Sequence, residues 1–461
     1  MSNSAWVVVN DKVLNITKFS NKHPGGKDLI LLAAGRDATI LFETYHPKPV
    51  SMQIVNKLQI GILNKEDSVI DKSFYSWKSD FYPVLRSRVV DRLNELNIAR
   101  RGGYSIKIKA FMLLFTFWFS LYRMCVSSFG VACLWSLLMG STASFIGTCI
   151  QHDGNHGAFS TNSFMNICAG WTLDMIGASA FTWEFQHMLG HHPYTNLLDT
   201  KDGFKNEEND PDVFSSFPFV RMHPFHPVSW YHKYQHLYTP ILFSFMTLLK
   251  VFQQDIETIW YNKLYHIDAS PRYSNIKNVI RFWFMKVLSC AYMLILPCYL
   301  HGVTKGSFLF IIGHCACSEL LATMFIVNHV IEGVAFAQDS AIEDDKKPKN
   351  IHGLTPMQQL PKSQKNIPLN DWAAVQCQTS VNWSSGSWFW NHFSGGLSHQ
   401  IEHHLFPSIC HTNYVYIQDV VQRTCEEYGV PYRNEPSLYQ AYRQMINHLY
   451  IMGQGDEKKE D

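Results

Sequence analysis

Long apolar runs alternate with strongly polar blocks along the chain, and this alternation predicts two different kinds of structure. The amino-terminal block is polar, and its short valine-containing apolar stretches at 6–10 and 12–16 predict two strands, followed by short helices from Lys27 onward. Further along, four apolar runs approach the roughly 20 residues that a helix needs to cross a bilayer. These runs, each expected to form one transmembrane helix, are residues 108–128, 130–150, 279–300 and 307–330.

Three clusters of histidine lie between and after these runs. The clusters are His152 with His156, then His187 with His191 and His192, and finally His403 with His404. Neutral imidazole is a good ligand for iron, zinc and copper, and residues three or four apart lie on one face of a helix. A soluble zinc hydrolase needs about three protein ligands, so these seven histidines are too many for one such ion and enough for two metals.

A fifth apolar stretch, residues 164–183, lies between the first two clusters and raises a question of topology. If this stretch crossed the membrane, the two clusters would face opposite sides and could not share metals. We therefore expect it to be buried or re-entrant, so that two membrane hairpins return all three clusters to one face. Arg100, Arg101, Lys107 and Lys109 precede the first run. Positive charge beside a span marks the cytosolic side, which places that face in the cytosol.

The amino-terminal block contains its own pair of histidines. His23 opens a His-Pro-Gly-Gly sequence, and His46 follows a short helical stretch. Glycine lets the backbone approach a flat ligand, and two such histidines could hold a haem iron from both faces. Because both axial positions would be filled, this haem would carry electrons rather than activate oxygen. For either residue alone, an exposed turn histidine is the plainer interpretation.

These motifs together resemble a known family. The three histidine clusters resemble those of membrane-bound fatty acyl desaturases, and Gln-Ile-Glu-His-His at 400–404, with the amino-terminal His-Pro-Gly-Gly, resembles the front-end desaturases fused to cytochrome b5. The resemblance covers nearly the whole chain. It implies a multidomain protein in which a small α+β cytochrome b5-like haem domain precedes an all-α membrane desaturase domain with four transmembrane helices and a cytosolic helical cap. The expected parts are the haem domain at 1–75, a connector at 76–105, the desaturase domain at 106–452 and a disordered tail at 453–461.

The resemblance also implies the cofactors and their ligands. Haem b would be held by His23 and His46. Two non-haem irons would be held by the seven clustered histidines, which are His152, His156, His187, His191, His192, His403 and His404, together with His329 at the end of the fourth apolar run. Asn328 beside it would contact a ligand or bridge through water.

Gln400 stands where the wider family has histidine. Its amide is a weaker ligand, so three roles are open: binding iron, holding a water or orienting a neighbour. His399 lies about 100° around a helix from it and is the alternative contact near the metals. We expect Asp153, Asn155 and Glu402 to fix the tautomers of the ligating imidazoles.

Other segments carry weaker predictions. His232 and His236 could act near the metals or the haem, or serve structure alone. The tryptophan-rich stretch 372–390 could line an acyl channel, lie at the membrane interface or simply belong to the core. Helices are predicted at 84–93 and 437–452, an acidic cytosolic loop at 200–217, and a flexible loop at 338–368.

Composition excludes some alternatives. A formal charge of +1 offers no case for binding nucleic acid, and the eleven cysteines without CxxC pairs are expected to be reduced thiols. The first residues lack the basic flank and apolar core of a signal peptide, and a folded motif begins too early for a transit peptide, so the amino-terminal block is expected in the cytosol.

Desaturation removes hydrogen from methylene carbons that no side-chain acid or base can activate, whereas iron with oxygen can. We therefore expect an endoplasmic reticulum membrane enzyme that uses oxygen and a long-chain polyunsaturated acyl lipid or acyl-CoA. No nicotinamide-binding fingerprint is present, so electrons would come from a separate NADH-cytochrome b5 reductase.

Residues around Phe159, 172–184 and 383–394 look most like algal delta-4 and delta-5 enzymes, and delta-4 is preferred. Delta-5, then delta-6 or delta-8, are the alternatives. A sphingolipid desaturase or lipid hydroxylase would use a similar iron centre, and a membrane electron carrier would need only the haem.

Overall fold

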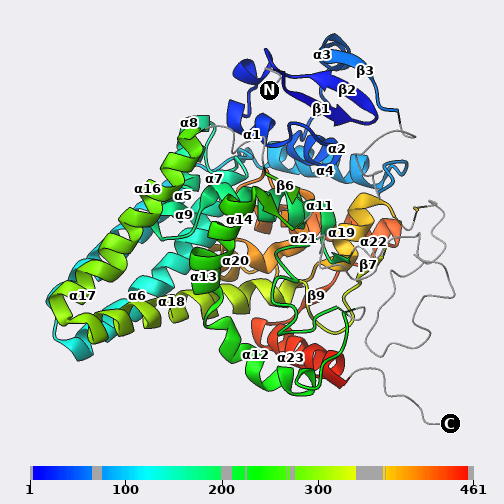
Figure 1. Ribbon diagram of the computed structural model, residues 1–461. Coiled ribbons are helices and arrows are strands. Elements are labelled where there is room, and N and C mark those ends of the chain that lie inside the picture. Colours follow the sequence, from blue (N-terminus) through cyan, green and yellow to red (C-terminus); the bar gives the residue numbers. More distant parts are fainter. Residues whose placement is uncertain are drawn as a thin grey trace, which may run out of the picture.

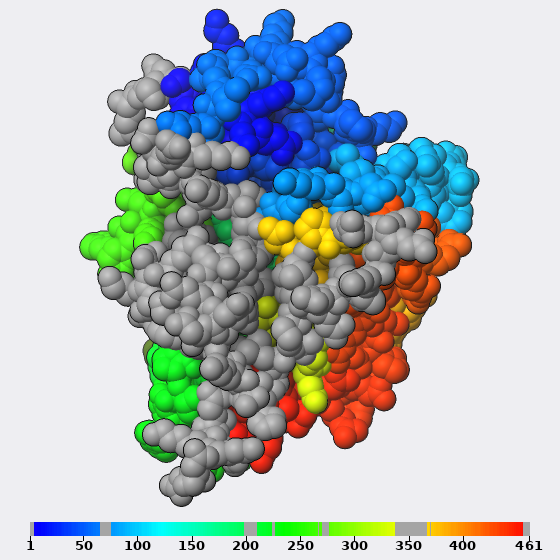
Figure 2. Space-filling view, turned by 90° about the vertical axis from the view of Figure 1, so that its right-hand side faces the viewer, coloured from blue at the N-terminus to red at the C-terminus, as the bar shows by residue number. Residues whose placement is uncertain are grey.

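The computed structural model describes residues 4–64, 75–198, 210–223, 226–265, 267–269, 276–338, 367–368 and 370–454. A small amino-terminal domain caps one end of a larger helical domain (Figure 1). The space-filling view shows this domain seated directly on the segment that follows it in the chain (Figure 2). This arrangement is the multidomain architecture expected from the sequence.

The amino-terminal domain is a three-stranded antiparallel sheet covered by short helices. Its strands, in the order β1-β2-β3, are β1 (Trp6–Val9), β2 (Lys12–Asn15) and β3 (Gln59–Ile62). Its helices are η1 (Ser20–Lys22), α1 (Lys27–Leu32), α2 (Thr39–Tyr45) and α3 (Met52–Leu58). Asn10 and Asp11 have φ values of 48° and 65°, which suits the tight turn that joins β1 to β2. The first two strands were predicted, whereas β3 was not.

The predicted connector contains α4 (Phe81–Glu95), which belongs to the core of the larger domain. Phe81, Leu85, Val89 and Leu93 recur every four residues and are all buried. They pack in one hydrophobic cluster with α22 (Tyr414–Tyr428). This contact ties the segment after the amino-terminal domain to the carboxy-terminal half of the chain.

Four helical stretches are long and apolar enough to cross a membrane, as predicted. The first hairpin is α5 (Tyr104–Val126) followed by α6 (Phe129–Ile146), whose helix continues through η2 (Gly147–Gln151) and α7 (His152–Asn155). The second is α16 (Ile276–Cys290), η6 (Ala291–Ile295) and α17 (Leu296–His301), then α18 (Val303–Phe325) and η7 (Ile326–Asn328).

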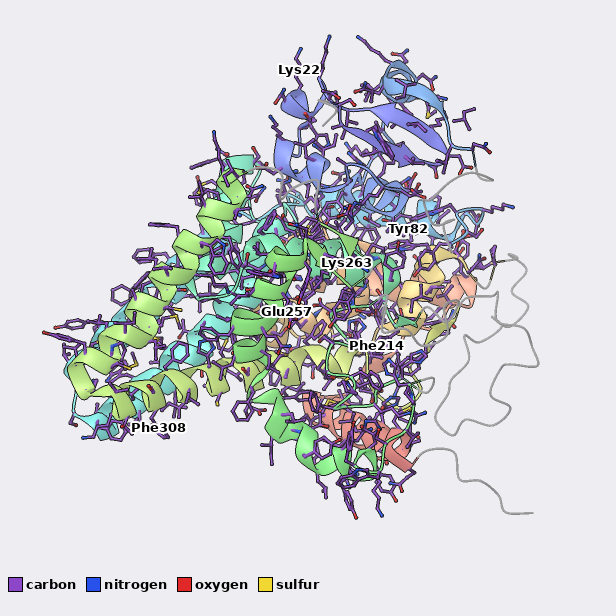
Figure 3. All side chains as sticks on the ribbon, viewed as in Figure 1. Lys22, Tyr82, Phe214, Glu257, Lys263 and Phe308 are labelled. Carbon is purple, nitrogen blue, oxygen red and sulfur yellow. The ribbon has the colours of Figure 1, made fainter. Side chains whose placement is uncertain are left out.

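The two hairpins form a bundle that projects from one side of the molecule. Figure 3 shows Phe308 near the free end of this bundle and Lys22 far away on the amino-terminal domain. Small residues allow α6 and α18 to touch, because a Cβ on Gly140 would lie 1.9 Å from the carbonyl oxygen of Gly313. The outer faces expose large apolar side chains such as Phe111 and Val287, which suits contact with lipid. The chain is therefore a membrane protein.

The fifth apolar stretch does not form a span. It is divided into α8 (Ser163–Gly170), α9 (Thr172–Met175) and α10 (Ala180–Trp183), each too short to cross a bilayer. The expectation that this stretch does not cross the membrane is confirmed. The first two histidine clusters can therefore meet.

The remaining elements form the helical cap around the histidines. Its helices are η3 (Glu184–His191), α11 (His192–Tyr194), η4 (His232–Tyr234), α12 (Gln235–Phe243), α13 (Met246–Leu249), η5 (Lys250–Gln254), α14 (Asp255–Tyr261), α19 (Trp372–Thr379), α20 (Trp388–Ser394), η8 (Leu397–His399), α21 (Gln400–Leu405), η9 (His411–Asn413), α22 and α23 (Leu438–Gln454). Two-residue strands pair as β4 (Leu197–Leu198) with β7 (Ala337–Gln338), β5 (Lys263–Leu264) with β6 (Ile267–Asp268), and β8 (Asn382–Trp383) with β9 (Asn434–Glu435).

Several weaker predictions can now be compared with the fold. Helix α23 continues to Gln454, two residues into the predicted disordered tail, and the rest of the tail lies outside the described residues. Most of the predicted flexible loop, 339–366, also lies outside them, as do residues 200–209 of the predicted acidic loop. All eleven cysteines are free, as expected.

Candidate metal centre

In the amino-terminal domain His23 and His46 face each other across a gap. Their ring centroids are 6.0 Å apart with an interplanar angle of 78°. Two imidazoles bound to one metal through bonds of about 2.1 Å place their ring centres roughly 6 Å apart. The Nδ1 atoms lie 3.1 Å from the carbonyl oxygen of Gly26 and 2.8 Å from that of Phe42, which leaves each Nε2 for a ligand. These residues fit the axial positions of a haem.

The second histidine cluster lies on a π-helix rather than an α-helix. Residues 184–191 form η3, in which the turn is wider than in an α-helix. The wider turn brings His187 and His192, five residues apart, within 3.1 Å of each other at their Nε2 atoms. Five residues along an ordinary α-helix would turn the second side chain about 140° away from the first. The π-helix therefore directs a third imidazole of this cluster, that of His192, toward the other histidines.

Two glycines allow the chain before the third histidine cluster to approach the helix that carries the first cluster. Gly395 and Gly396 have φ values of 70° and 87° before η8 and α21. A Cβ on Gly395 would lie 2.6 Å from the carbonyl oxygen of Thr148 in η2, close to His152 along the chain. Glycine permits both this left-handed conformation and this close approach.

All the predicted histidine ligands converge in the cap beside the ends of the spans. The first ligand group contains His152, His156, His187 and His403, and the second contains His191, His329 and His404. Within each group the candidate ligand atoms all lie within 4.8 Å of one another. His192 lies between the groups, with its ring centroid 4.7 Å from those of both His403 and His404. The structure thus offers two adjacent metal positions.

The ring nitrogens at the centre fit metal ions. His152 Nε2 lies 3.3 Å from His187 Nε2, and two ligands at right angles on one ion would be about 3 Å apart. Two lone pairs at this separation repel each other unless a proton or a cation lies between them. Among the described residues, the buried Nε2 atoms of His156, His191 and His403 have no hydrogen-bond partner. A pair of irons would satisfy these atoms.

The protonation of the rings also suits metal binding. Burial and the neighbouring imidazoles hold the pKa well below 6.5 for His187, His192, His403 and His404. These side chains are therefore neutral near pH 7, as metal ligation requires. For His191, burial lowers the pKa, but the charge and hydrogen bond of Asp210 and the charge of Asp212 together outweigh burial and raise it. The Asp210 carboxylate will also strengthen His191 as a ligand.

Two aspartates orient the second cluster from behind. Asp212 Oδ2 lies 2.6 Å from His187 Nδ1, and the two oxygens of Asp210 lie 3.0 and 3.1 Å from His191 Nδ1. Each Nδ1–H can donate to its carboxylate, which leaves Nε2 free for a metal. Sequence reasoning placed both aspartates in a cytosolic loop and missed this role. The only feature of the sequence that could have indicated this role is the Asp-Pro-Asp sequence at 210–212, which follows the second cluster.

Four further ligands, His156, His329, His403 and His404, are oriented by neutral groups. His329 Nδ1 donates to the carbonyl oxygen of Thr379 at 3.0 Å, and His404 Nδ1 donates to Gln376 Oε1 at 2.8 Å. The Tyr414 hydroxyl oxygen lies 3.1 Å from His403 Nδ1, and the Tyr45 hydroxyl oxygen lies 2.5 Å from His156 Nδ1. None of these partners was predicted from the sequence.

The residues that were expected to orient the ligating imidazoles contact other groups instead. Asp153 is bonded to His411 Nδ1 at 2.8 Å. Glu402 accepts hydrogen bonds from Asn382 and Tyr432, each at 2.8 Å. Asn155 Nδ2 has no partner within the described part of the chain, and its oxygen lies against Gly170. His399 accepts from the backbone N–H of Gly386 at 3.0 Å, so it is not a contact of the metal centre. These expectations were wrong, and for Asp153 the reason is that its partner, His411, comes from a distant segment of the chain.

The Gln400 side chain reaches the second ligand group, but its amide oxygen does not face the ligand nitrogens of that group. The indole N–H of Trp383, which can only donate, bonds Asn328 Oδ1 at 2.8 Å. The Asn328 Nδ2 group must then donate to Gln400 Oε1 at 3.1 Å. The NH2 of Gln400 consequently faces the Nε2 atoms of His329 and His404 at 2.9 and 3.0 Å. Iron ligation by the amide oxygen does not agree with this chain of bonds, whereas holding a water or orienting a neighbour does.

A third group of candidate ligands is already satisfied without metal. Asp153, Cys410 and His411 lie close together and are buried. Cys410 Sγ lies 3.0 Å from the Asp153 carboxylate, and Lys109 Nζ lies 3.2 Å from His411 Nε2. Because the lysine ammonium donates to the remaining nitrogen of a neutral imidazole, this group serves as a structural hydrogen-bond network that joins α5 and α7 to η9.

The other histidine pair and the tryptophan-rich segment have mainly structural contacts. His232 Nε2 lies 2.8 Å from the carbonyl oxygen of Pro218, and the ring of His236 packs on Tyr450. Trp372 is fully buried and stacks on Trp77, whereas Trp388 is 60% exposed. The segment thus divides between the core and a surface that suits the membrane interface.

Replacing Asp210 with asparagine tests the orientation of His191. The substitution removes the negative charge and one of the two acceptor oxygens near Nδ1–H, which weakens His191 as a ligand, so we expect a roughly 10–100-fold fall in iron affinity or activity. Iron per polypeptide would be measured by elemental analysis beside the haem spectrum. Asp91, which is exposed on α4, provides the matched control D91N. Unchanged iron content in D210N would contradict this role.

Comparison with known proteins adds independent findings. Residues 127–436 match the fatty acid desaturase family, and residues 1–64 match the cytochrome b5-like heme/steroid binding domain. An "Acyl-lipid (8-3)-desaturase" of Physcomitrium patens is 32% identical over 97% of this chain and 88% of that protein. The "Delta(5) fatty acid desaturase A" of Dictyostelium discoideum is 32% identical, covering 98% and 91%. The "Acyl-lipid (7-3)-desaturase, chloroplastic" of Chlamydomonas reinhardtii is 31% identical, covering 96% and 80%.

Proposed function

This chain belongs to the fatty acid desaturase family, with a cytochrome b5-like domain at its amino terminus, and from that premise we propose its reaction. It inserts a cis double bond between an existing double bond and the carboxyl end of a long-chain polyunsaturated acyl chain. The observation that carries the proposal is the convergence of seven imidazoles in two adjacent ligand groups, with His192 between them, beside a haem-binding domain. The coarser activity, oxygen-dependent desaturation of acyl lipids, follows from the family.

The ligands have distinct proposed roles. His23 and His46 hold haem b, and the seven clustered histidines with His329 hold two irons through their Nε2 atoms. Irons bound there would supply the oxygen chemistry that removes hydrogen from an unactivated methylene, and the haem would supply electrons singly. The protein's own contribution is to keep the imidazoles neutral, oriented and close together in a buried site.

Gln400 is proposed to act as a hydrogen-bond donor beside the second ligand group. Its NH2 faces His329 Nε2 and His404 Nε2, a position where it can hold a water or another oxygen near a metal. Trp383 and Asn328 fix that direction. This interpretation replaces the expectation that its oxygen binds iron.

The position of the new double bond is proposed to be delta-4. Delta-5 is the first alternative, supported by the Dictyostelium relative that is named for that position, followed by delta-6 or delta-8. Either an acyl-CoA or a glycerolipid would carry the chain. A separate NADH-cytochrome b5 reductase would reduce the haem, and the membrane would be that of the endoplasmic reticulum, with the haem domain and the ligand groups cytosolic.

Product analysis tests this proposal. A yeast strain expressing the full chain would be fed polyunsaturated acids of defined length and unsaturation, and double-bond positions would be read by mass spectrometry. A new bond on the carboxyl side of an existing one is the expected product, and its position assigns the regioselectivity. Hydroxylated lipid, desaturated sphingoid base or no new product would each contradict the proposal.

A further inference from the structure

One side chain of the amino-terminal domain reaches into the candidate metal centre. Tyr45 is the last residue of α2 and directly precedes His46. Its hydroxyl oxygen lies 2.5 Å from His156 Nδ1, and its ring stacks on the His156 ring at a centroid distance of 6.0 Å. Tyr45 and its hydrogen bond to His156 therefore connect His46, the expected axial ligand of the haem, to a ligand of the first ligand group.

The surrounding contacts hold this arrangement in place. Arg100 donates to the carbonyl oxygen of Tyr45 at 3.2 Å and to Ser408 Oγ at 3.0 Å. Arg86 donates to the carbonyl oxygen of His46 at 3.4 Å. Both arginines come from the segment between the two domains, so they fix the peptide that carries both Tyr45 and His46.

Apolar packing fixes the same interface. Tyr45 belongs to a buried hydrophobic cluster in which Leu32 of α1 meets Phe181 of α10 and Phe185 of η3. Figure 1 shows α1 and α2 on the side of the small sheet that faces the larger domain. The amino-terminal domain is thus docked on the first and second clusters through its haem-binding side.

The direction of the hydrogen bond follows from the ligand role of His156. If Nε2 binds iron, the ring proton resides on Nδ1, and Nδ1–H donates to the Tyr45 hydroxyl oxygen. The hydroxyl oxygen, 2.5 Å from His156 Nδ1, is therefore the acceptor that fixes the plane of this imidazole.

We propose that Tyr45 is a positioning residue that couples the haem to the iron at His156, so that electrons enter the di-iron centre through the first ligand group. The inference rests on the proposed function. A haem held by His23 and His46 would lose one electron and become ferric, and an iron held by His156 would gain that electron and become ferrous. No proton moves, and the phenol keeps its hydrogen.

Haem re-oxidation measures this coupling directly. The purified full-length protein, with haem and iron, would be photoreduced under anaerobic conditions, and the decay of the ferrous haem absorbance would be followed as the electron leaves. Tyr45→Phe removes only the hydroxyl, so we expect decay about 10-fold slower or more, with an unchanged haem spectrum, haem potential and iron content.

Tyr414→Phe is the matched control. Tyr414 bonds His403 Nδ1 in the same ligand group but does not adjoin a haem ligand. This variant should re-oxidise its haem at the wild-type rate even if desaturation falls. Reducing the metal centre of Tyr45→Phe chemically, without the haem, should restore the single-turnover product yield of the wild type.

Three results would overturn the inference. They are wild-type re-oxidation in Tyr45→Phe, equal slowing in Tyr414→Phe, and loss of iron from Tyr45→Phe, which would leave Tyr45 a purely structural role. Failure of the proposed function looks different: the wild type would transfer electrons normally yet form no desaturated product from any acid supplied.

Discussion

Replacing His404 with alanine should abolish desaturation and leave the haem absorption spectrum unchanged. His404 belongs to the second ligand group with His191 and His329, and its ring centroid lies 4.8 Å from the first and 5.0 Å from the second of these. Removing one of three imidazoles leaves too few protein ligands for an iron. The fall in activity should exceed the roughly 10–100-fold effect that is typical of residues behind the ligands.

The measurements are iron per haem in purified protein and lipid product in expressing cells. His236→Ala is the matched control, because that histidine packs on Tyr450 away from both ligand groups, and it should retain iron and activity. If H404A kept both its iron and its product, the metal centre would be wrongly placed. A wild type that reduces its haem but forms no product would favour a simple electron carrier.

Replacing His46 with alanine should have the second largest effect. The variant loses one of the two axial ligands of the haem, so its spectrum should change or disappear, while the two ligand groups for iron remain complete. A tethered donor acts at an effective concentration in the millimolar range, and its loss should reduce turnover by roughly 100-fold or more at ordinary donor concentrations.

Two further measurements separate this effect from misfolding. Iron content should match the wild type, and an added soluble cytochrome b5 at high concentration should restore part of the desaturation. Full activity in a variant without haem would show that the fused domain is not the electron donor. Loss of iron would show instead that the mutation disrupts the docked interface.

Much of the fold could be predicted because its signals are local. Spans depend on unbroken apolar length, and all four predicted runs lie within a few residues of the observed helical stretches. The strands β1 and β2 follow from short apolar stretches rich in valine on either side of the Asn10-Asp11 turn. In contrast, both isoleucines of β3 are exposed, so the strand buries no apolar face of its own and forms because its backbone pairs with β2.

The candidate ligands could be predicted for a similar reason, since their side chains alone supply the chemistry. Their partners could not, because a hydrogen bond to Nδ1 can come from any part of the chain. Asp210 and Asp212 follow His191 and His187 by 19 and 25 residues, and Tyr45 precedes His156 by 111. The nearby acids that looked suitable, Asp153 and Glu402, are bonded elsewhere.

The sequence by itself determined the kinds of residue available: four apolar lengths that match a bilayer, a haem-binding motif, and enough imidazole for two metals. Tertiary structure alone decided which nitrogens converge, which carboxylates and phenols hold the rings, and which way Gln400 points. The physical reason is that composition and periodicity act over one or two helical turns. Hydrogen-bond direction and metal geometry depend on atoms that meet only after distant segments have packed.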